Sequence, residues 1–366
     1  MAEVTLFLAG DVMTGRGVDQ ILPHPGSPEL REELVTDARR YVALAEAVAG
    51  PVPRPVPPGW PWGAALRLLD AERPDARIVN LETPLTARGE HHPGKGIHYR
   101  MHPANVPCLT AARLDVCALG NNHVLDFGPT GLGDTLDALR AAGIRPAGAG
   151  RDADEAWSPA VVPLAGDRRL LVWSVGAVSS GVFPQWAAEA GRPGVAYLPE
   201  VSLATAGALA ERIARIARPA DLVVVSVHWG SNWGHEVPDE HVEFAHALVD
   251  AGVHVVHGHS SHHPRAVERY RGRLVLYGCG DLIDDYEGIG GQEAYRPELR
   301  LLYLASLDAA TGELRGLRLI PLRMCRMRLQ PATPAEAGWL ADLLDTLGRP
   351  SGTRVTPTAD GVLTLR

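Results

Sequence analysis

The sequence predicts an α/β fold, and three observations support this prediction. Short apolar runs recur along the chain, several of them end on a polar residue, and helical segments follow. This pattern of strand, polar tip and helix appears three times within the first 142 residues. In α/β folds ligands bind beyond the carboxyl ends of the strands, so the polar tips mark a candidate site. No repeat of fixed period or low-complexity tail interrupts the pattern, and we interpret residues 1–366 as a single domain.

The composition argues against several classes of protein. Of the 366 residues, 46% are apolar, which is enough for a substantial core. The 43 acidic and 35 basic residues are interspersed and give a formal charge of −8, so we expect no nucleic-acid partner. No long apolar run and no apolar leader is visible, and we expect a cytoplasmic protein without a membrane span. The four cysteines lack the paired spacing of zinc or redox motifs.

The expected strands are short aliphatic runs, as is typical of buried strands. In chain order they are residues 4–9, 76–81, 115–119, 170–175, 222–227, 253–256 and 274–277, followed by a hairpin of residues 301–307 and 314–321. The first run leads into Asp11 and the second into Glu82. The third leads into Asn122 and the fifth into His228, while Asp281 follows the seventh.

The expected helices lie between or after these strands, at residues 31–49, 64–69, 131–142, 242–251 and 335–347. Gly143 follows the third helix, where glycine is typical of a C-cap. Two insertions are expected to be loops. The first, at about 50–62, contains six prolines between Gly50 and Pro61, and the second, at about 86–105, is rich in glycine and proline.

The polar residues at the strand ends combine carboxylates, an amide and imidazoles without thiolate. Nine of the fifteen histidines lie between His228 and His263. This mixture suits one or two hard or borderline divalent ions. We expect calcium or manganese first, with zinc and iron as alternatives, and no organic cofactor.

Each of these residues also has an ordinary structural explanation. An aspartate such as Asp11 after a glycine often serves only as a turn or helix cap, and Glu82 before Thr83-Pro84 could be a solvated loop carboxylate. A lone His228 is more often a hydrogen-bonded interior residue than a ligand. The ordered set, rather than any single member, favours a metal site.

That ordered set resembles a known family. The segments that carry the resemblance are residues 9–16 (AGDVMTGR), 79–86 (VNLETPLT), 119–128 (LGNNHVLDFG), 226–230 and 258–262. They resemble the calcineurin-like metallophosphoesterases and, more narrowly, their capsule-biosynthesis, poly-γ-glutamate (CapA-like) group. The resemblance implies an α/β/β/α sandwich.

The resemblance also implies roles for individual residues. It places metal ligands at Asp11, Glu82, Asn122, His228, His259 and His262, and an acid/base histidine at His123. An imidazole oriented by a carboxylate such as Asp126 is able to shuttle a proton at neutral pH. The chain departs from the general pattern at Met13, where a histidine is usual, at Glu82, where an aspartate is usual, and at Asp281, where the capsule group has asparagine.

The leading functional hypothesis was metal-dependent peptide epimerisation. Cytoplasmic members resembling this chain are associated with lasso-peptide biosynthesis, which implies an isomerase that inverts the Cα of a C-terminal residue in a ribosomally made precursor peptide. Such a reaction needs acid/base groups on two faces. We assign one pair to His123 with Asp126, and the other to His259 or His228 with Asp11 or Asp281.

Three other functions stay open at this point. Hydrolysis of a phosphoester by a metal-bound hydroxide is the runner-up, the polymer role of the capsule group ranks low, and a binding module without catalysis is the remaining alternative. For a peptide substrate, Lys95 and Arg100 are candidates to bind a C-terminal carboxylate, and Trp229 and Trp233 to line an apolar pocket.

Overall fold

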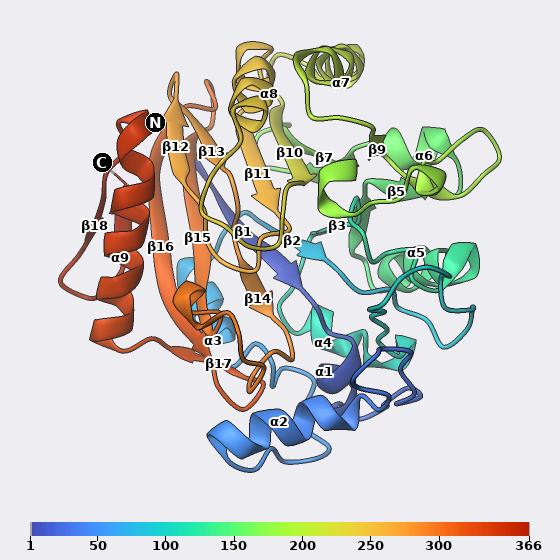
Figure 1. Cartoon of the computed structure of the whole chain (residues 1–366). Coiled ribbons are helices and arrows are strands. Elements are labelled where there is room, and N and C mark those ends of the chain that lie inside the picture. The colour runs from blue at the N-terminus through green and yellow to red at the C-terminus, as the bar shows by residue number, and fades with distance from the viewer. Residues whose placement is uncertain (1, 366) are drawn as a thin grey trace.

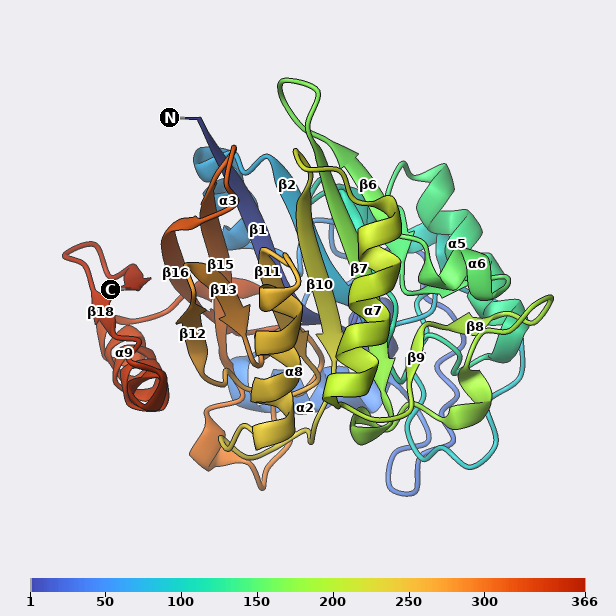
Figure 2. The same ribbon diagram turned by 90° about the horizontal axis from the view of Figure 1, so that it is seen from above.

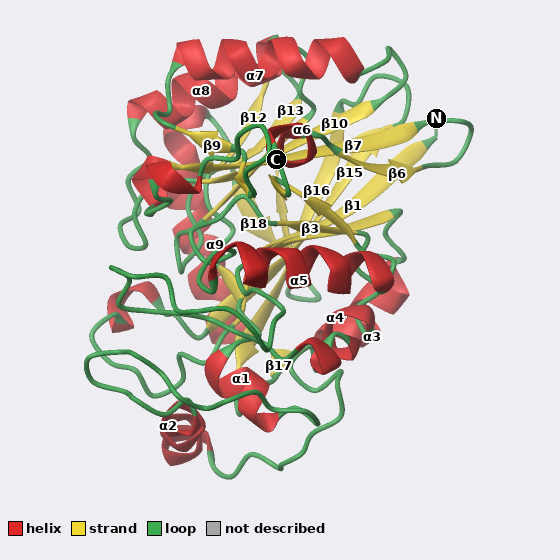
Figure 3. Ribbon diagram, turned by 90° about the vertical axis from the view of Figure 1, so that its right-hand side faces the viewer, coloured by secondary structure: helices red, strands yellow, loops and turns green. Residues whose placement is uncertain are grey.

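Two β-sheets pack face to face in the computed structural model, which describes residues 2–365. Helices cover both outer faces, so that the layers run helix, sheet, sheet, helix (Figure 3). The predicted α/β/β/α sandwich is therefore confirmed. Figure 1 follows the chain through these layers from the blue N-terminal strand to the red C-terminal helix.

The first sheet is built around β1 (Glu3–Val12), which lies parallel to β2 (Ala76–Leu81) and antiparallel to β15 (Leu299–Asp308). Its main order is β18-β19-β16-β15-β1-β2-β3-β4. The remaining members are β3 (Val116–Ala118), β4 (Arg145–Ala147), β14 (Asp281–Ile283), β16 (Leu314–Met324), β17 (Leu329–Pro331), β18 (Val355–Pro357) and β19 (Leu363–Leu365).

The second sheet is built around β10 (Leu222–His228), which lies parallel to β7 (Arg169–Ala177) and β11 (Val255–His259). Its main order is β12-β13-β11-β10-β7-β6. The other members are β6 (Ala160–Pro163), β9 (Tyr197–Leu198), β12 (Val267–Tyr270) and β13 (Arg273–Leu276). A separate small ribbon pairs β5 (Ala149–Gly150) with β8 (Gly194–Val195).

Helices on the outer face of the first sheet include α2 (Arg39–Ala49), α3 (Ala64–Glu72) and α5 (Gly128–Ala141). Two helices cover the second sheet, α7 (Leu203–Ile216) and α8 (Asp239–Asp250). The other helices are α1 (Arg16–Ile21), α4 (Pro107–Thr110), α6 (Ala153–Trp157) and α9 (Pro334–Gly348). Short 3-10 turns occupy Pro103–Asn105, Val178–Ser180, Pro184–Trp186, Glu293–Tyr295 and Arg349–Ser351.

Alternation along β1 explains how the layers are held together. Leu6 and Leu8 point to one face and join the core between the two sheets, where they meet residues such as Val224. Phe7 and Ala9 point to the other face and join the core under the helices. The strand is almost entirely buried because both of its faces are covered.

The sequence-based elements are confirmed with small shifts of their ends, except for the helix expected at residues 31–49. That helix begins only at Arg39. Glu32 is instead turned inward, where it accepts a hydrogen bond from Arg16 at 3.0 Å and another from Tyr41. A long-range contact therefore overrides local helix propensity.

Among the described residues, four helices were missed from the sequence, namely α1, α4, α6 and α7. The amphipathic helix α7 begins with a reciprocal capping box between Ser202 and Thr205, and the short helix α1 follows the first strand. The segments at about 50–62 and 86–105 are irregular apart from turns and the short Pro103–Asn105 helix. Within residues 2–365, none of the helices combines the length and apolar character needed to cross a bilayer.

We predict that Leu8→Ala lowers the free energy of unfolding by about 2–5 kcal/mol, because it leaves a cavity between the sheets. Leu203→Ala is the matched control, since Leu203 is 58% exposed, and it should change stability by less than about 0.5 kcal/mol. Urea unfolding followed by circular dichroism measures both. Equal losses for the two variants would contradict the assigned core.

Candidate metal centre

The predicted ligand residues come together at one edge of the sandwich. Asp11 lies near the end of β1, and its register partners across the sheet are Asp281 on β14 and Asn80 on β2. In the second sheet, His228 on β10 is the register partner of His259 on β11. The site is therefore formed where the ends of strands from both sheets meet.

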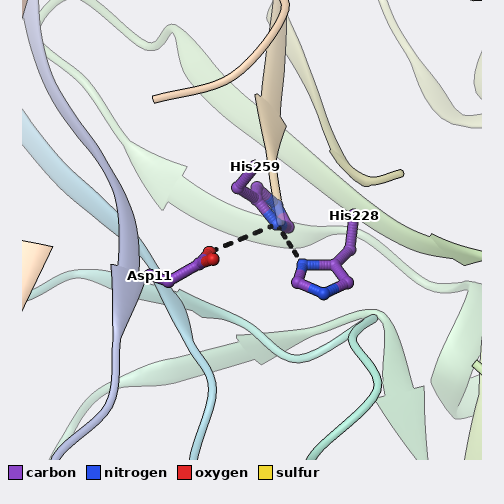
Figure 4. Close-up of side chains that lie close together, drawn as sticks. All are labelled: Asp11, His228 and His259. Carbon is purple, nitrogen blue, oxygen red and sulfur yellow. Dashed lines mark hydrogen bonds and ion pairs between the residues drawn. The ribbon is translucent and has the colours of Figure 1, made fainter. Parts of the chain in front are cut away.

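Within residues 2–365, two groups of side chains have ligand atoms close enough to hold a metal ion, and both include Asp11. The first consists of Asp11, His228 and His259, and the second of Asp11, His262 and Asp281. Within each group the ligand atoms lie within 4.8 Å of one another. In Figure 4 the ring of His259 lies between the other two members of the first group. Its Nδ1 is 2.8 Å from Nδ1 of His228 and 3.9 Å from Oδ1 of Asp11.

Several buried atoms at this edge have no hydrogen-bond partner. They are Oδ2 of Asp11, Oδ1 of Asn122, Nε2 of His228 and Oδ2 of Asp281. The three oxygens are acceptors, and Nε2 of His228 is one as well in the tautomer that carries its proton on Nδ1. Buried acceptors are normally satisfied, and a set containing only acceptors matches a cation. The residues therefore fit a divalent metal ion.

Asn80 holds two of the carboxylates in place and was missed in the sequence analysis. Its Nδ2 donates to Oδ1 of Asp11 at 2.7 Å and to Oε2 of Glu82 at 3.1 Å. Asn121 in turn donates to Oδ1 of Asn80 at 3.0 Å. The signal was an asparagine directly after the apolar pair Ile78-Val79, two residues before Glu82 and thus on the same face.

The carboxylates are crowded in a setting that disfavours their charge. Burial, reinforced by repulsion from Asp281, raises the pKa of Asp11 to about 7. Burial and repulsion from Asp11 raise the pKa of Glu82 well above its usual value. Although burial opposes it, the charge of His262 lowers the pKa of Asp281. A metal cation would stabilise all three anions.

The histidines of the first group are in the form that binds metals. Burial, together with nearby histidines, lowers the pKa of His228 and of His259 well below the usual value. Both rings are therefore neutral at pH 7. Ser226 contacts Nε2 of His259 at 2.8 Å, which leaves Nδ1 of that ring directed at Asp11 and His228.

His123 lies beside the metal-binding groups and is oriented by Asp126. Its Nδ1 is 2.6 Å from Oδ2 of Asp126, so the ring donates to that carboxylate and Nε2 becomes an acceptor. Nε2 lies 3.8 Å from Oε1 of Glu82. Burial lowers the pKa of His123 to about 4, which keeps the ring neutral.

The residues predicted to bind substrate lie in different settings. Lys95 is nearly buried, pairs with Asp126 and donates to the backbone oxygen of Asn122. Arg100 is half-buried and its guanidinium lies 4.4 Å from the centre of the Phe127 ring. The ammonium of Lys95 and the guanidinium of Arg100 therefore both contact neighbouring protein groups.

The two tryptophans predicted to line a substrate pocket, Trp229 and Trp233, lie in different environments. Trp229 is fully buried, and its indole donates to the backbone oxygen of Tyr277 at 3.0 Å, so it packs the core and does not face a ligand. Trp233 is half-buried and lies 5.5 Å from the ring of His262. With Tyr295, 5.3 Å away, it forms an aromatic wall beside the second metal-binding group.

A buried network behind the site was not foreseen. Arg16 donates to Asp285 and lies 4.6 Å from the ring centre of Tyr99. The hydroxyls of Tyr99 and Tyr286 are 2.7 Å apart, and their rings contact His123 and His262 respectively. The hydroxyl of Tyr286 also contacts the sulfur of Met13, the residue that replaces the more usual histidine.

Comparisons with known proteins point to capsule and polymer synthesis. Residues 5–286 match the family described as bacterial capsule synthesis protein PGA_cap. The chain is 52% identical over 361 residues to a probable polyglutamine synthesis accessory protein of Mycobacterium tuberculosis, covering 98% of this chain and 95% of that protein.

Two Bacillus proteins are more distant relatives. The PGA biosynthesis protein CapA of Bacillus subtilis is 28% identical, over 56% of this chain and 52% of its own length. The capsule biosynthesis protein CapA of Bacillus anthracis is 24% identical, over 77% of this chain and 60% of its own length.

These relatives overturn the leading functional hypothesis. They are named for polyglutamine, PGA or capsule synthesis, so the prediction of a peptide epimerase in lasso-peptide biosynthesis was wrong, and no catalytic activity is established for the chain. The histidine and carboxylate pairs are compatible with proton transfer at carbon, but one ligand set on one fold serves many functions. The capsule and polymer role, which was ranked low, is the one that the relatives support.

We predict that Mn²⁺ affinity rises with pH between 6 and 8, because Asp11, Glu82 and His262 all have raised pKa values and lose protons on binding. Asp11, with its pKa raised to about 7, must lose a proton before it binds the ion, whereas His228 and His259 are already neutral. One proton released corresponds to roughly a tenfold gain per pH unit. Calorimetric titration at pH 6.0, 7.0 and 8.0 measures this, and an affinity that falls with pH would contradict the ligand set.

We predict that Asn80→Leu weakens Mn²⁺ binding by about 10- to 100-fold, because both carboxylates lose their orienting donor. Asn105→Leu is the matched control, since Asn105 is equally buried but bonds to Asp19 and not to a ligand. The control should lose stability and keep its metal affinity. Equal affinities for the two variants would show that Asn80 does not position the ligands.

Proposed function

The chain belongs to the bacterial capsule synthesis protein family, and we propose that it is an accessory protein in the synthesis of a glutamyl polymer, acting through the metal centre around Asp11. The observation that carries the proposal is the set of unpartnered buried acceptors at that centre. The support for the polymer is the name of the 52% identical mycobacterial protein, which the chain matches over nearly its whole length.

We further propose that the resident ion is manganese. Calcium favours an all-oxygen shell, whereas each of the two ligand groups contains imidazole nitrogen. A mixture of imidazole and carboxylate without thiolate suits a borderline ion. When bound, such an ion acts as a Lewis acid that attracts carboxylate or carbonyl oxygen, which a glutamyl polymer offers at every residue.

In this proposal, different side chains around the metal centre contact different groups of the glutamyl polymer. Asp126, itself paired with Lys95, accepts from Nδ1 of His123, so that Nε2 of the ring is an acceptor able to take the N–H of a polymer amide. Trp233 and Tyr295 provide the apolar wall against which the methylene groups of a glutamyl side chain can pack. Glu82, close to both His123 and His228, links this acceptor to the first metal-binding group.

We predict that polymer production in a bacterium lacking its own copy is restored by the wild-type gene but not by Asp11→Asn or His259→Ala. Both variants remove a ligand from the centre. Asp37→Asn, in which the altered aspartate is partly exposed, pairs with Arg39 and belongs to neither ligand group, should restore production fully. Polymer is measured as glutamate released by acid hydrolysis of the purified high-molecular-weight fraction.

Two other outcomes of this complementation experiment would have different meanings. Normal polymer levels with Asp11→Asn, at matched protein levels, would show that the metal centre is not needed for the accessory role. Loss of polymer with Asp37→Asn as well would point to impaired folding, and thermal unfolding of each purified variant separates that case.

A further inference from the structure

We propose that the protein has a second ligand site, a pocket beside β12 that binds an organic cation, namely a protonated amine carried on an apolar body. The pocket has a volume of about 520 Å³, which is in the range of small-molecule sites. It lies among three segments: the start of α8 with the loop before it, the β12–β13 hairpin, and the C-terminal end of α9. Figure 2 shows β12 between α9 and α8.

The charge of the pocket selects a cation. Glu236, Asp239 and Glu268 line it, and none of its described lining residues is lysine or arginine. The titratable bases that face it are His235 and His246. A cleft with carboxylates of one sign and low-dielectric walls concentrates ions of the opposite sign.

Glu268 is the group built to anchor the ligand. The residue is only 7% exposed. Its carboxylate accepts from the hydroxyl of Tyr277 at 2.6 Å and contacts Nε2 of His246 at 3.0 Å, and the described residues give it no lysine or arginine partner. A carboxylate offers about four acceptor positions, so room remains for an ammonium N–H. Among the described residues the ionic partner of Glu268 is His246, which carries a charge only when protonated, and an amine would add a second cationic partner to this buried carboxylate.

The apolar walls of the pocket determine which kind of group can carry the amine. Val237, Val242, Ala266 and Leu347 line the pocket around the carboxylates. These side chains exclude a heavily hydrated ion and favour an alkyl or aryl body. The ring of His246 is held in place by stacking on Tyr270 at 3.6 Å, so the anchoring end of the pocket is already ordered.

The pocket is separate from the metal centre. Glu268, Tyr277 and His246 belong to neither of the two metal-binding groups. One link between the two is His235, which lines the pocket and whose ring lies 4.6 Å from the ring of His263. Binding of an amine is therefore testable in its own right, whatever the outcome for polymer synthesis.

The test titrates the full-length, manganese-loaded protein with n-hexylammonium, and with hexanol and hexanoate as probes of the same length. Calorimetry and chemical-shift changes report binding. Hexylammonium should bind at least tenfold more tightly than hexanol, and hexanoate should not bind. Equal affinity for the amine and the alcohol would overturn the proposal, because the carboxylates would then have no part in recognition.

Variants locate the site. Glu268→Gln should weaken hexylammonium binding at least tenfold, and Thr346→Trp, which places a bulky ring at the exposed mouth, should abolish it. Glu240→Gln is the matched control on the same helix but outside the pocket, and should bind as the wild type does. Thr346→Trp keeps the test decisive if Glu268→Gln is poorly folded. Wild-type affinity in Thr346→Trp would overturn the proposal.

Discussion

The repulsion among three buried carboxylates is the constraint on which the arrangement of the metal centre depends. Asp11, Glu82 and Asp281 are each at most 2% exposed, and they meet at one edge of the first sheet. The protein offsets only part of this cost, through the amide of Asn80 and the imidazole of His262. Buried anions without sufficient compensation are costly, and a divalent cation is the natural remedy.

The two sheets contribute different kinds of ligand, so the sandwich and the centre depend on each other. Oxygen ligands follow the strands of the first sheet, and nitrogen ligands follow β10 and β11 of the second. The core between the sheets, with Leu6 and Leu8 on one side and Val224 on the other, therefore sets the distance between oxygen and nitrogen donors. A metal ion in turn ties the open edges of the two sheets together.

Much of this centre was predictable from the sequence because strand ends are easy to recognise and parallel strands place their ends together. Asp11 and His228 were found in that way, whereas His259 was assigned only through the family resemblance, and the structure brings all three into one group. Asn80 was missed because only residues at strand ends were considered, although an asparagine after the apolar pair Ile78-Val79 was visible. Arg16 and Tyr286 were missed for another reason, since their partners lie far away in the chain.

Other predictions failed where local sequence carries too little information. Trp229 follows a ligand histidine and was taken for a pocket residue, yet the alternation of the chain directs it into the core against Tyr277. The prediction of function was wrong for a more general reason, because the same ligands on the same fold support different biological roles. Only the relatives distinguished polymer synthesis from peptide epimerisation.

The most direct test of a metal centre around Asp11 is a crystal structure of the manganese-loaded protein with anomalous diffraction data. We expect an anomalous peak within bonding distance of the carboxylate of Asp11 and of the imidazoles of His228 and His259. Any second peak should lie beside His262 and Asp281. Manganese bound elsewhere, with Asp11 left without a metal contact, would contradict this assignment.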